Sequence, residues 1–232
     1  MNIENIQKDL KKLANPEKAK ILQGFFKTGK GQYGEDDIFL GIVVPEQRKV
    51  AKKYANLNLG EIKKLLSSKI HEHRLVSLFI LANQYQKADK QTKKKIFNFY
   101  LKNAKNINNW DLVDVSAPNI VGDYLLNKDK SILYKLAKSK NIWEKRIAIM
   151  ATFSFIRNNG FDATLKISEI LLEDEHDLIH KAVGWMLREL GKRNQAIEEK
   201  FLKKYYKKMP RTMLRYAIER FSENKRKSYL GK

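Results

Sequence analysis

Apolar residues recur at helical spacing along most of the chain. In the segment 73–85 they occupy positions i, i+3, i+4, i+7 and i+10, namely Leu75, Leu78, Phe79, Ala82 and Tyr85. This spacing places them on one face of a helix. The segments 143–156 and 179–190 follow a similar pattern. The nearest approach to a strand is 38–44, where Gly41 and the following Pro45 indicate a helix end and a loop instead. The pattern predicts an all-α chain.

The predicted helices also recur at a regular interval. Three of them carry a basic residue near the start (Arg74, Arg146 and Lys181), and a helix with Asp114 fits between the first two, at intervals of about 40, 32 and 35 residues. A last member, 210–221, follows about one repeat later. Helical hairpins at this period are typical of HEAT-like repeats, and such arrays curve around a concave surface. We therefore predict one domain, 1–232, folded as a curved right-handed α-solenoid of HEAT-like helical-hairpin repeats. Its tail is expected to fray from about residue 222. The alternative is an irregular helical bundle.

Charge narrows the class of partner. The 232 residues carry a formal net charge of +21, whereas solubility alone calls for roughly 2–8 units in a small domain. A positive excess of this size indicates an anionic binding partner, which is nucleic acid, an acidic membrane surface or an acidic protein. There are no cysteines, which excludes thiolate chemistry and fits a cytosolic protein. We find no apolar run of membrane-spanning length and no secretion signal.

Two short motifs are weak signals. The sequence "GKGQYG" matches a dinucleotide-binding fingerprint through Gly29, Gly31 and Gly34, but it follows a helical segment where the fingerprint requires a strand, so we interpret it as a loop. In "HDLIH", His176 and His180 have zinc-protease spacing but lack the glutamate of that motif. We interpret this segment as a helix start and predict no metal site.

The segment "NNWDLVDVSAP" combines an indole with a carboxylate. On a helix, Trp110 and Asp114 are four residues apart and share one face. Asp111 lies off that face and belongs with the N-terminal capping arrangement. Pro118 cannot donate to the carbonyl of Asp114, so a helix that continues through it is irregular there. The alternative is that a new helix begins nearby, capped by Ser116.

Later segments offer companions for this pair. Arg146 lies in the next predicted repeat, and Trp185 lies in the one after, beside Gly184, which leaves room for close approach. If the repeats stack in register, Asp114, Arg146 and Lys181 stand at similar depths on neighbouring helices. Tryptophans at helical spacing are usually core residues, and we keep that interpretation for Trp143.

Taken together, these segments resemble a known family. "NWDLVD" with its following proline, "NIWEKRIAI" and "KAVGWMLRE", flanked by "FLGIVVPEQR" and "MPRTMLRYAIERF", are similar to bacterial DNA alkylation-repair glycosylases of the AlkD type. The resemblance extends from about the first helix to Phe221. It implies HEAT-like repeats with DNA in a basic concavity, a catalytic aspartate at Asp114, a cleft arginine at Arg146, and cleft tryptophans at Trp110 and Trp185. Some relatives have a second tryptophan where this chain has Asn109, which should alter packing more than chemistry.

The resemblance also implies a reaction. The expected activity is monofunctional hydrolysis of the N-glycosidic bond of cationic N3- or N7-alkylated purines in duplex DNA, by a bacterial cytoplasmic monomer that uses no metal or organic cofactor. The DNA would be held in an open groove. Further backbone contacts are expected from Lys145, Lys181, Arg188, Arg48 and Arg215. Two other readings stay open: a HEAT-repeat protein that binds nucleic acid without chemistry, and an adaptor for an acidic protein.

Overall fold

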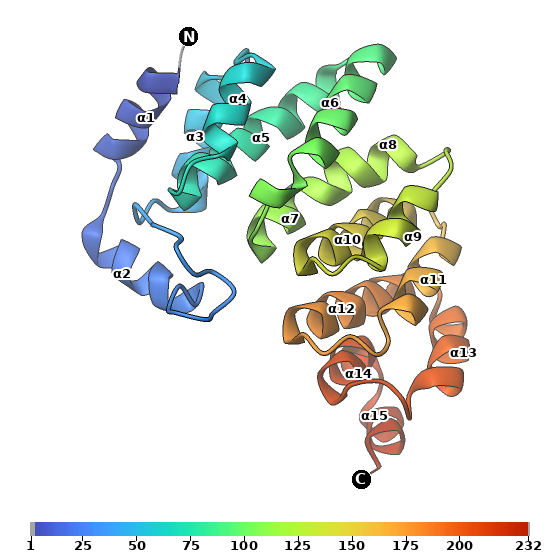
Figure 1. Ribbon diagram of the computed structural model, residues 1–232. Helices are drawn as coiled ribbons and strands as arrows, with labels where there is room; N and C mark the ends of the chain where they lie inside the picture. The colour runs from blue at the N-terminus through green and yellow to red at the C-terminus, as the bar shows by residue number, and fades with distance from the viewer. Residues whose placement is uncertain (1–2, 232) are drawn as a thin grey trace. The chain divides into compact units, whose positions relative to one another are not determined.

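The computed structural model describes residues 3–231, and this part of the chain is helical throughout (Figure 1). It contains no β-strand, only an isolated parallel bridge between Ile38 and Ile70. None of its helices combines the length and the apolar character needed to cross a membrane. The prediction of an all-α chain is confirmed. In chain order the helices are α1 (Ile3–Lys12), α2 (Pro16–Phe25), α3 (Val44–Lys53), α4 (Leu59–Leu66), α5 (His71–Lys87), α6 (Lys90–Lys102), η1 (Ala104–Asn106), α7 (Trp110–Ala117), η2 (Pro118–Gly122), α8 (Asp123–Leu125), α9 (Ser131–Ala137), α10 (Ile142–Arg157), α11 (Asp162–Ile170), α12 (Asp177–Arg193), α13 (Gln195–Tyr205), α14 (Arg211–Ala217), η3 (Ile218–Arg220) and α15 (Glu223–Leu230).

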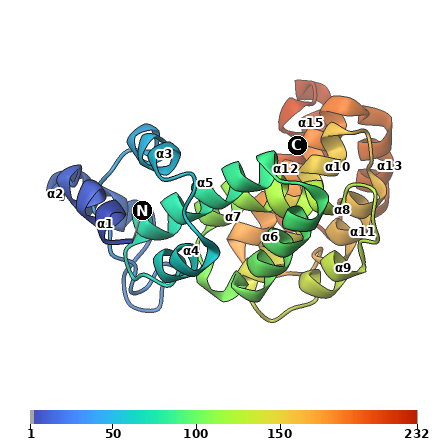
Figure 2. The ribbon, with the colours of Figure 1, turned by 90° about the horizontal axis from the view of Figure 1, so that it is seen from above.

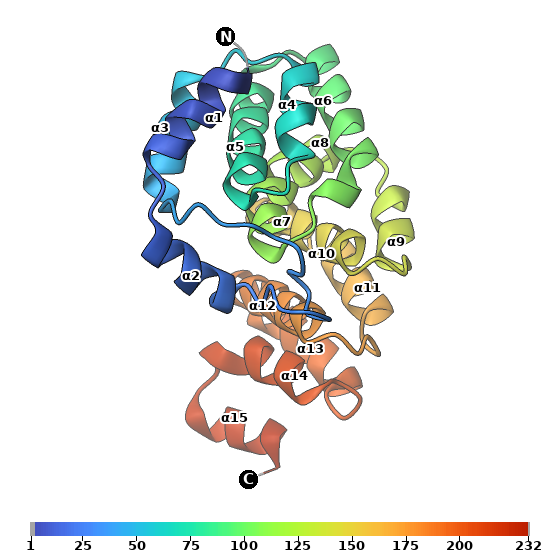
Figure 3. The same cartoon turned by 60° about the vertical axis from the view of Figure 1, so that its left-hand side comes forward.

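The chain divides into two compact units, Met1–Ser116 and Ala117–Lys232. In the first unit α5 is the central helix, and most of its residues are buried. Helices α3 and α4 pack on opposite sides of α5, and α1 contacts all three (Figures 2 and 3). The core of this unit therefore surrounds the helix in which sequence periodicity is clearest.

The second unit consists of two rows of helices (Figure 1). Helices α10, α12 and α14 pack in succession, and α9, α11 and α13 form the other row against them. Helices α12 and α14 approach closely at Gly184. A Cβ atom there would lie 2.5 Å from both the Met213 carbonyl oxygen and the Tyr216 Cβ. Gly184 is therefore required by the packing of α14 on α12, and this row is the stack of helical repeats that the spacing predicts.

The helix that carries Asp114 widens at Pro118. The backbone stays in the right-handed helical region at Ala117, and the next five residues, Pro118–Gly122, form a π turn before α8. A π turn accommodates a proline because the regular backbone pairing is already shifted there. The hydroxyl of Ser116 donates back to the Leu112 carbonyl at 2.5 Å instead of capping a new helix. The predicted irregularity after Asp114 is present, and the alternative of a restart capped by Ser116 is wrong.

Helix starts agree with the repeat spacing. Arg74, Arg146 and Lys181 lie near the starts of α5, α10 and α12. The tail beyond residue 222 contains a short helix, α15, with no buried side chain, and its fraying stays a prediction. That the two units act as one repeat domain stays a prediction.

One buried acid in the second unit makes stability depend on pH. Glu198 on α13 is 2% exposed, and its Oε1 has no hydrogen-bond partner. Burial, with a smaller effect of Glu199, raises the pKa of this carboxyl from 4.5 to about 8. The folded-state pKa lies above the unfolded value. The ionisation of Glu198 therefore does not lower the free energy of unfolding below pH 4.5, and it lowers that free energy increasingly as the pH rises towards 8.

Glu198→Gln should therefore become more favourable, relative to wild type, as the pH rises. We expect the difference in free energy of unfolding to shift by roughly 3 kcal/mol in favour of the glutamine between pH 5 and pH 8. Urea unfolding of both proteins at the two pH values measures this shift. A difference that does not change with pH would contradict the buried, protonated state of Glu198.

Candidate functional site

The predicted indole–carboxylate pair lies on α7 in the first unit. Trp110 and Asp114 are both partly buried, so neither belongs to the core. Side chains at the start of the helix satisfy its first backbone amides. Asn109 Oδ1 accepts from the Trp110 amide, and Asp111 Oδ1 accepts from the Leu112 amide, both at 2.8 Å. This agrees with the predicted capping role of Asp111 and fixes the turn from which Trp110 projects.

A buried charge network anchors the same turn. Asp111 Oδ2 pairs with His71 Nε2 at 2.8 Å, and the other ring nitrogen of His71 pairs with Asp37 Oδ2 at 3.1 Å. Arg74 donates to Asp37 Oδ1 at 2.6 Å. Asn109, which is fully buried, donates to Asp37 Oδ2 at 3.1 Å. The start of α7 is thereby tied to α5 and to the loop that contains Asp37.

His71 carries a positive charge in this network. Its burial favours the neutral ring, but the charge of Asp111 and the hydrogen bonds to Asp111 and Asp37 outweigh that effect and raise the pKa of His71 to about 9. His73, two residues along α5, is buried without a carboxylate, and burial together with Arg74 lowers its pKa to about 4. Two neighbouring histidines are therefore held in opposite protonation states.

Aromatic rings cover one side of Trp110. Phe26 stacks on the indole with centroids 5.2 Å apart and an angle of 14°. Phe25 meets the indole edge-on at 6.0 Å. Phe39 stacks on Phe26 at 4.9 Å and on the ring of His71 at 4.5 Å, and Phe26 also contacts the His71 ring, with centroids 5.0 Å apart. The indole therefore packs against a cluster of three mutually contacting rings, one of which is the charged histidine.

Replacing His71 with glutamine should destabilise the first unit most at low pH. Its folded-state pKa of about 9 exceeds the ordinary value of 6.5, so its contribution to stability is fully present below pH 6.5 and is lost as the pH rises through 9. We expect the deficit of His71→Gln, relative to wild type, to be roughly 3 kcal/mol larger at pH 6 than at pH 9.5. Urea unfolding monitored at both pH values measures it.

His73→Gln is the matched control. Its folded-state pKa lies below 6.5, so the contribution of the neutral ring is present above pH 6.5 and is lost as the pH falls through 4. The deficit of His73→Gln should therefore shrink on acidification, which is the opposite trend. If the deficit of His71→Gln also shrank on acidification, His71 would not be an imidazolium.

The second unit contains the other predicted site residues. Arg146 on α10 is 4% exposed and donates to the Leu178 carbonyl at 2.6 Å, which ties α10 to the start of α12. Trp185 on α12 is partly buried, and its Nε1 donates to Glu189 Oε1 at 3.1 Å. That bond fixes the orientation of the indole. Trp143 is 7% exposed, so its interpretation as a core residue is confirmed.

The predicted backbone contacts fall into two groups. Lys145 pairs with Asp174 at 2.6 Å, Lys181 pairs with Asp177 at 2.6 Å, and Arg188 pairs with Glu219. Arg215 on α14 and Arg48 on α3 are exposed, and the guanidinium of Arg48 lies 4.1 Å above the ring of Phe79. Lys145, Lys181 and Arg188 lie on the packed helices α10 and α12, and each is already paired with a carboxylate.

The two weak motifs have structural roles. "GKGQYG" lies in the loop between α2 and α3, as interpreted, and Gly31 adopts a φ of 75°. His176 caps α12, with its Nδ1 accepting from the Leu178 amide at 3.1 Å. No group of three metal-ligating side chains occurs within residues 3–231.

Sequence reasoning missed the network around Asp37 and His71. The sequence pattern singles out neither residue, because His71 lies 34 residues from Asp37 and 40 residues from Asp111. The two phenylalanines at the end of α2 were also overlooked. The available signal is Asn109, since an asparagine that accepts a backbone hydrogen bond at a helix start still has an amide group to donate, and a buried donor needs a partner.

Comparison with known proteins gives a consistent result. The family model described as "DNA alkylation repair enzyme" matches residues 6–221. Among solved structures, one described as a predicted DNA alkylation repair enzyme from Enterococcus faecalis superposes with a TM-score of 0.70 at 19% identity, covering 90% of this chain and 97% of that chain. At this identity the likeness concerns the fold. Comparison with curated proteins gives no significant match. Because the family model matches well over half of the sequence, the chain belongs to the DNA alkylation repair enzyme family.

Proposed function

We propose that this protein is a DNA glycosylase that hydrolyses the N-glycosidic bond of cationic N3- or N7-alkylated purines in duplex DNA, without cleaving the strand. Family membership supports a DNA repair role. The observation that carries the finer proposal is Asp114. It is a partly buried carboxylate one turn from a partly buried indole, at a π turn, in a chain of net charge +21.

The chemistry needs only one carboxylate. Alkylation at N3 or N7 gives the base a positive charge, so it leaves without being protonated. The deoxyribose becomes oxocarbenium-like as the bond stretches. Asp114 would stabilise that charge and orient or deprotonate the attacking water. The reaction as proposed uses no metal, no organic cofactor and no lysine Schiff base.

The tryptophans would position the sugar. An indole face attracts cationic or polarised C–H groups, typically by roughly 0.5–2 kcal/mol. Phe26 covers one face of Trp110, so the deoxyribose would meet the other. Trp185, whose ring is oriented by Glu189, would contact the lesion strand from the second unit.

Cations of two kinds would hold the phosphates. Arg146 is buried and bonded to a backbone carbonyl, so we propose it as a fixed positive charge for one phosphate rather than as a mobile grip. Arg48 and Arg215 are exposed and would contact the backbone directly. Lys145, Lys181 and Arg188 would exchange their present carboxylate partners for phosphates, which makes them weaker contributors.

The direct test is base release. The purified protein is incubated with globally methylated duplex DNA, and the soluble fraction is analysed by mass spectrometry for free 3-methyladenine and 7-methylguanine. Release above the rate in buffer, with abasic but uncut strands, is the expected result. Tight binding of the DNA with no base released would contradict the proposal, and it would favour the alternative of a non-catalytic nucleic-acid-binding protein.

A further inference from the structure

Helix α13 carries a stripe of exposed lysines, which we call the α13 stripe. Its four members recur at i, i+3, i+4 and i+7 and therefore share one helix face: Lys200, Lys203, Lys204 and Lys207. The last of them lies in the turn after α13, where Tyr206 keeps right-handed helical backbone angles. The buried side chains of α13, among them Phe201 and Leu202, lie on the opposite face. The stripe therefore faces solvent.

The buried face of α13 packs on α12. A Cβ atom at Gly191 of α12 would meet the carboxylate of Glu198, which is on that buried face. The α13 stripe accordingly points away from α12. Figure 1 shows α13 at the outer edge of the second unit.

Carboxylates do not neutralise the α13 stripe. The twelve residues 200–211 contain six cations and no acid. Glu199, which precedes them, pairs with Lys225 at 2.5 Å. Lys204 lies 4.0 Å from Glu169, but these side chains are 68% and 55% exposed, so the pair is screened by water. Within residues 3–231 the other three lysines of the stripe form no ion pair. Like charges one turn apart destabilise a helix, and a bound polyanion would remove that repulsion.

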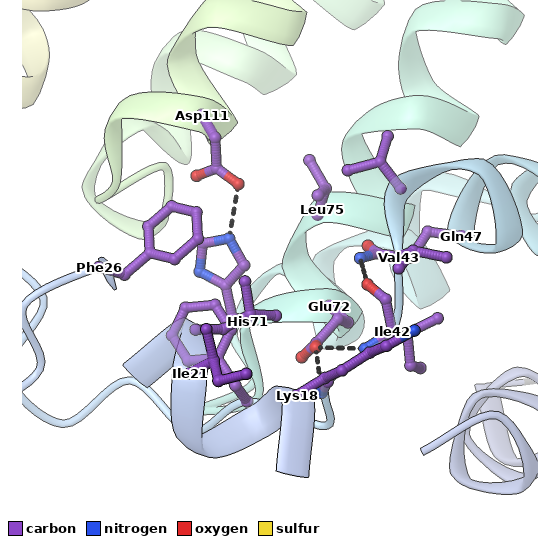
Figure 4. A pocket seen from close by; sticks show the side chains of 14 residues that line it. Lys18, Ile21, Phe26, Ile42, Val43, Gln47, His71, Glu72, Leu75 and Asp111 are labelled. Atoms are coloured by element: carbon purple, nitrogen blue, oxygen red, sulfur yellow. Dashed lines mark hydrogen bonds and ion pairs between the residues drawn. The ribbon is translucent and has the colours of Figure 1, made fainter. Parts of the chain in front are cut away.

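The surroundings of the stripe indicate which kind of anion it suits. A membrane surface and an acidic protein both call for exposed apolar anchors on the binding face. Among the described residues, large exposed apolar side chains occur only between Leu13 and Val44, in the first unit. Two of them, Ile21 and Val43, line a pocket there (Figure 4). Because the stripe offers charge without such anchors, it fits the phosphate backbone of nucleic acid, which charge alone can hold.

The neighbouring rings favour duplex over single-stranded nucleic acid. Single-strand sites present open aromatic faces on which bases stack. Tyr205 is buried, and Tyr206 is half-buried, with Tyr229 meeting its ring edge-on at 5.3 Å. From Lys200 to Lys207 a helix rises about 10 Å, which matches roughly three base steps of a duplex. The stripe can therefore follow one strand of a duplex without contacting its bases.

We propose that the α13 stripe binds the phosphate backbone of a second DNA duplex. This inference rests on the proposed function, which places the lesion-bearing duplex against α10, α12 and α14. Since the stripe points away from α12, a duplex on those helices leaves it open. One molecule then holds two DNA segments at once and can pass from one to the other without entering free solution.

Bridging of two unmethylated duplexes tests the proposal with the full-length protein. One duplex carries a donor fluorophore and the other an acceptor, with one protein for every two duplexes at about 50 mM salt. We expect energy transfer with wild type, and its loss when protein is in large excess, because each duplex then has a molecule of its own. Changing all four stripe lysines to glutamine should reduce the energy transfer at least about tenfold. Changing the same four to arginine keeps the charge and should preserve it.

A charge-matched control uses four exposed lysines at the end of α5 and on α6: Lys87, Lys90, Lys94 and Lys95. Their fourfold glutamine variant has the same net charge as the stripe variant, and it should bridge as wild type does. Equal loss of bridging in both glutamine variants would show that net charge is responsible and would overturn the proposal. Wild type that binds one duplex but never bridges two would overturn it as well.

Binding of one labelled duplex, followed by fluorescence anisotropy, separates this proposal from the proposed function. The glutamine variant of the stripe should still bind one duplex. If it bound none, the stripe would be the only DNA surface, and both the second duplex and the placement of the lesion strand on α10, α12 and α14 would be wrong. Stripe-dependent binding to vesicles of phosphatidylserine and phosphatidylcholine, without bridging of DNA, would assign the stripe to a membrane instead. Bridging is read on unmethylated DNA, so a protein that releases no base leaves this test unchanged.

Discussion

Replacing Asp114 with asparagine should reduce the release of 7-methylguanine from methylated duplex DNA by at least roughly 10²–10³-fold while leaving DNA binding intact. A preorganised group facing developing charge is typically worth that much in rate. Asparagine keeps the size of the side chain but removes the negative charge that would stabilise the sugar, and it cannot accept a proton from water. The loss should therefore appear in single-turnover rates with excess enzyme, where binding is saturated.

A charge-matched control separates chemistry from global electrostatics. Asp129→Asn removes a carboxylate that is exposed and bonded to the Ser131 amide in the loop after α8. Its net charge equals that of Asp114→Asn, and its single-turnover rate should match wild type. If Asp114→Asn released 7-methylguanine as fast as wild type, the catalytic assignment would be wrong. If neither the wild type nor Asp114→Asn released a base, and Asp114→Asn only bound the DNA more tightly, the protein would bind nucleic acid without acting as a glycosylase.

Affinity for duplex DNA should fall steeply with salt. A protein that neutralises six to ten phosphates loses roughly 10³–10⁵ in affinity between 50 and 200 mM salt, because each contact releases condensed counterions. The net charge of +21 leads us to expect a loss of affinity in this range. A titration of a methylated oligonucleotide by fluorescence anisotropy at several salt concentrations measures it. A flat slope with weak affinity would favour the adaptor for an acidic protein.

The exposure of individual cations sharpens this measurement. Arg215 is exposed. Arg215→Gln should therefore reduce the steepness of the plot of log affinity against log salt concentration by about 1. Arg215→Lys keeps the charge and should keep the slope. Lys145→Gln removes a cation that is paired with Asp174, so its effect on the slope should be smaller. Equal slopes for wild type and Arg215→Gln would remove Arg215 from the interface.

Local pattern was enough to predict the helices and their starts. Leu75, Leu78 and Phe79 lie on a period that only a helix satisfies, and they are all buried on α5. The disturbance after Asp114 followed from Pro118, because its missing amide is a property of one residue. Gly184 is linked to a close approach by its lack of a side chain, and the element that approaches it is α14.

The rest depends on tertiary contacts that no local pattern encodes. Nothing near His71 shows that Asp37 and Asp111, from two distant segments, enclose it. Glu198 follows a helix start rich in polar residues and is typical of a solvated face, yet it is 2% exposed. The local pattern does not show that Arg146 is 4% exposed and bonded to the start of α12, so its proposed interaction with a phosphate stays a prediction. The sequence therefore placed the titratable and binding side chains on the correct helices, but it did not predict which residues surround them or how deeply they are buried.

His71 and Glu198 are buried groups whose raised pKa values have a calorimetric consequence near neutral pH. Near neutral pH each is protonated in the folded protein and mainly deprotonated in the unfolded chain. These two groups therefore take up more than one proton from the buffer on folding, an uptake that His73 partly offsets because its pKa is lowered, and they make the native molecule more positive than its formal charge of +21. The apparent heat of unfolding must then vary with the ionisation enthalpy of the buffer, being different in Tris and in phosphate at the same pH.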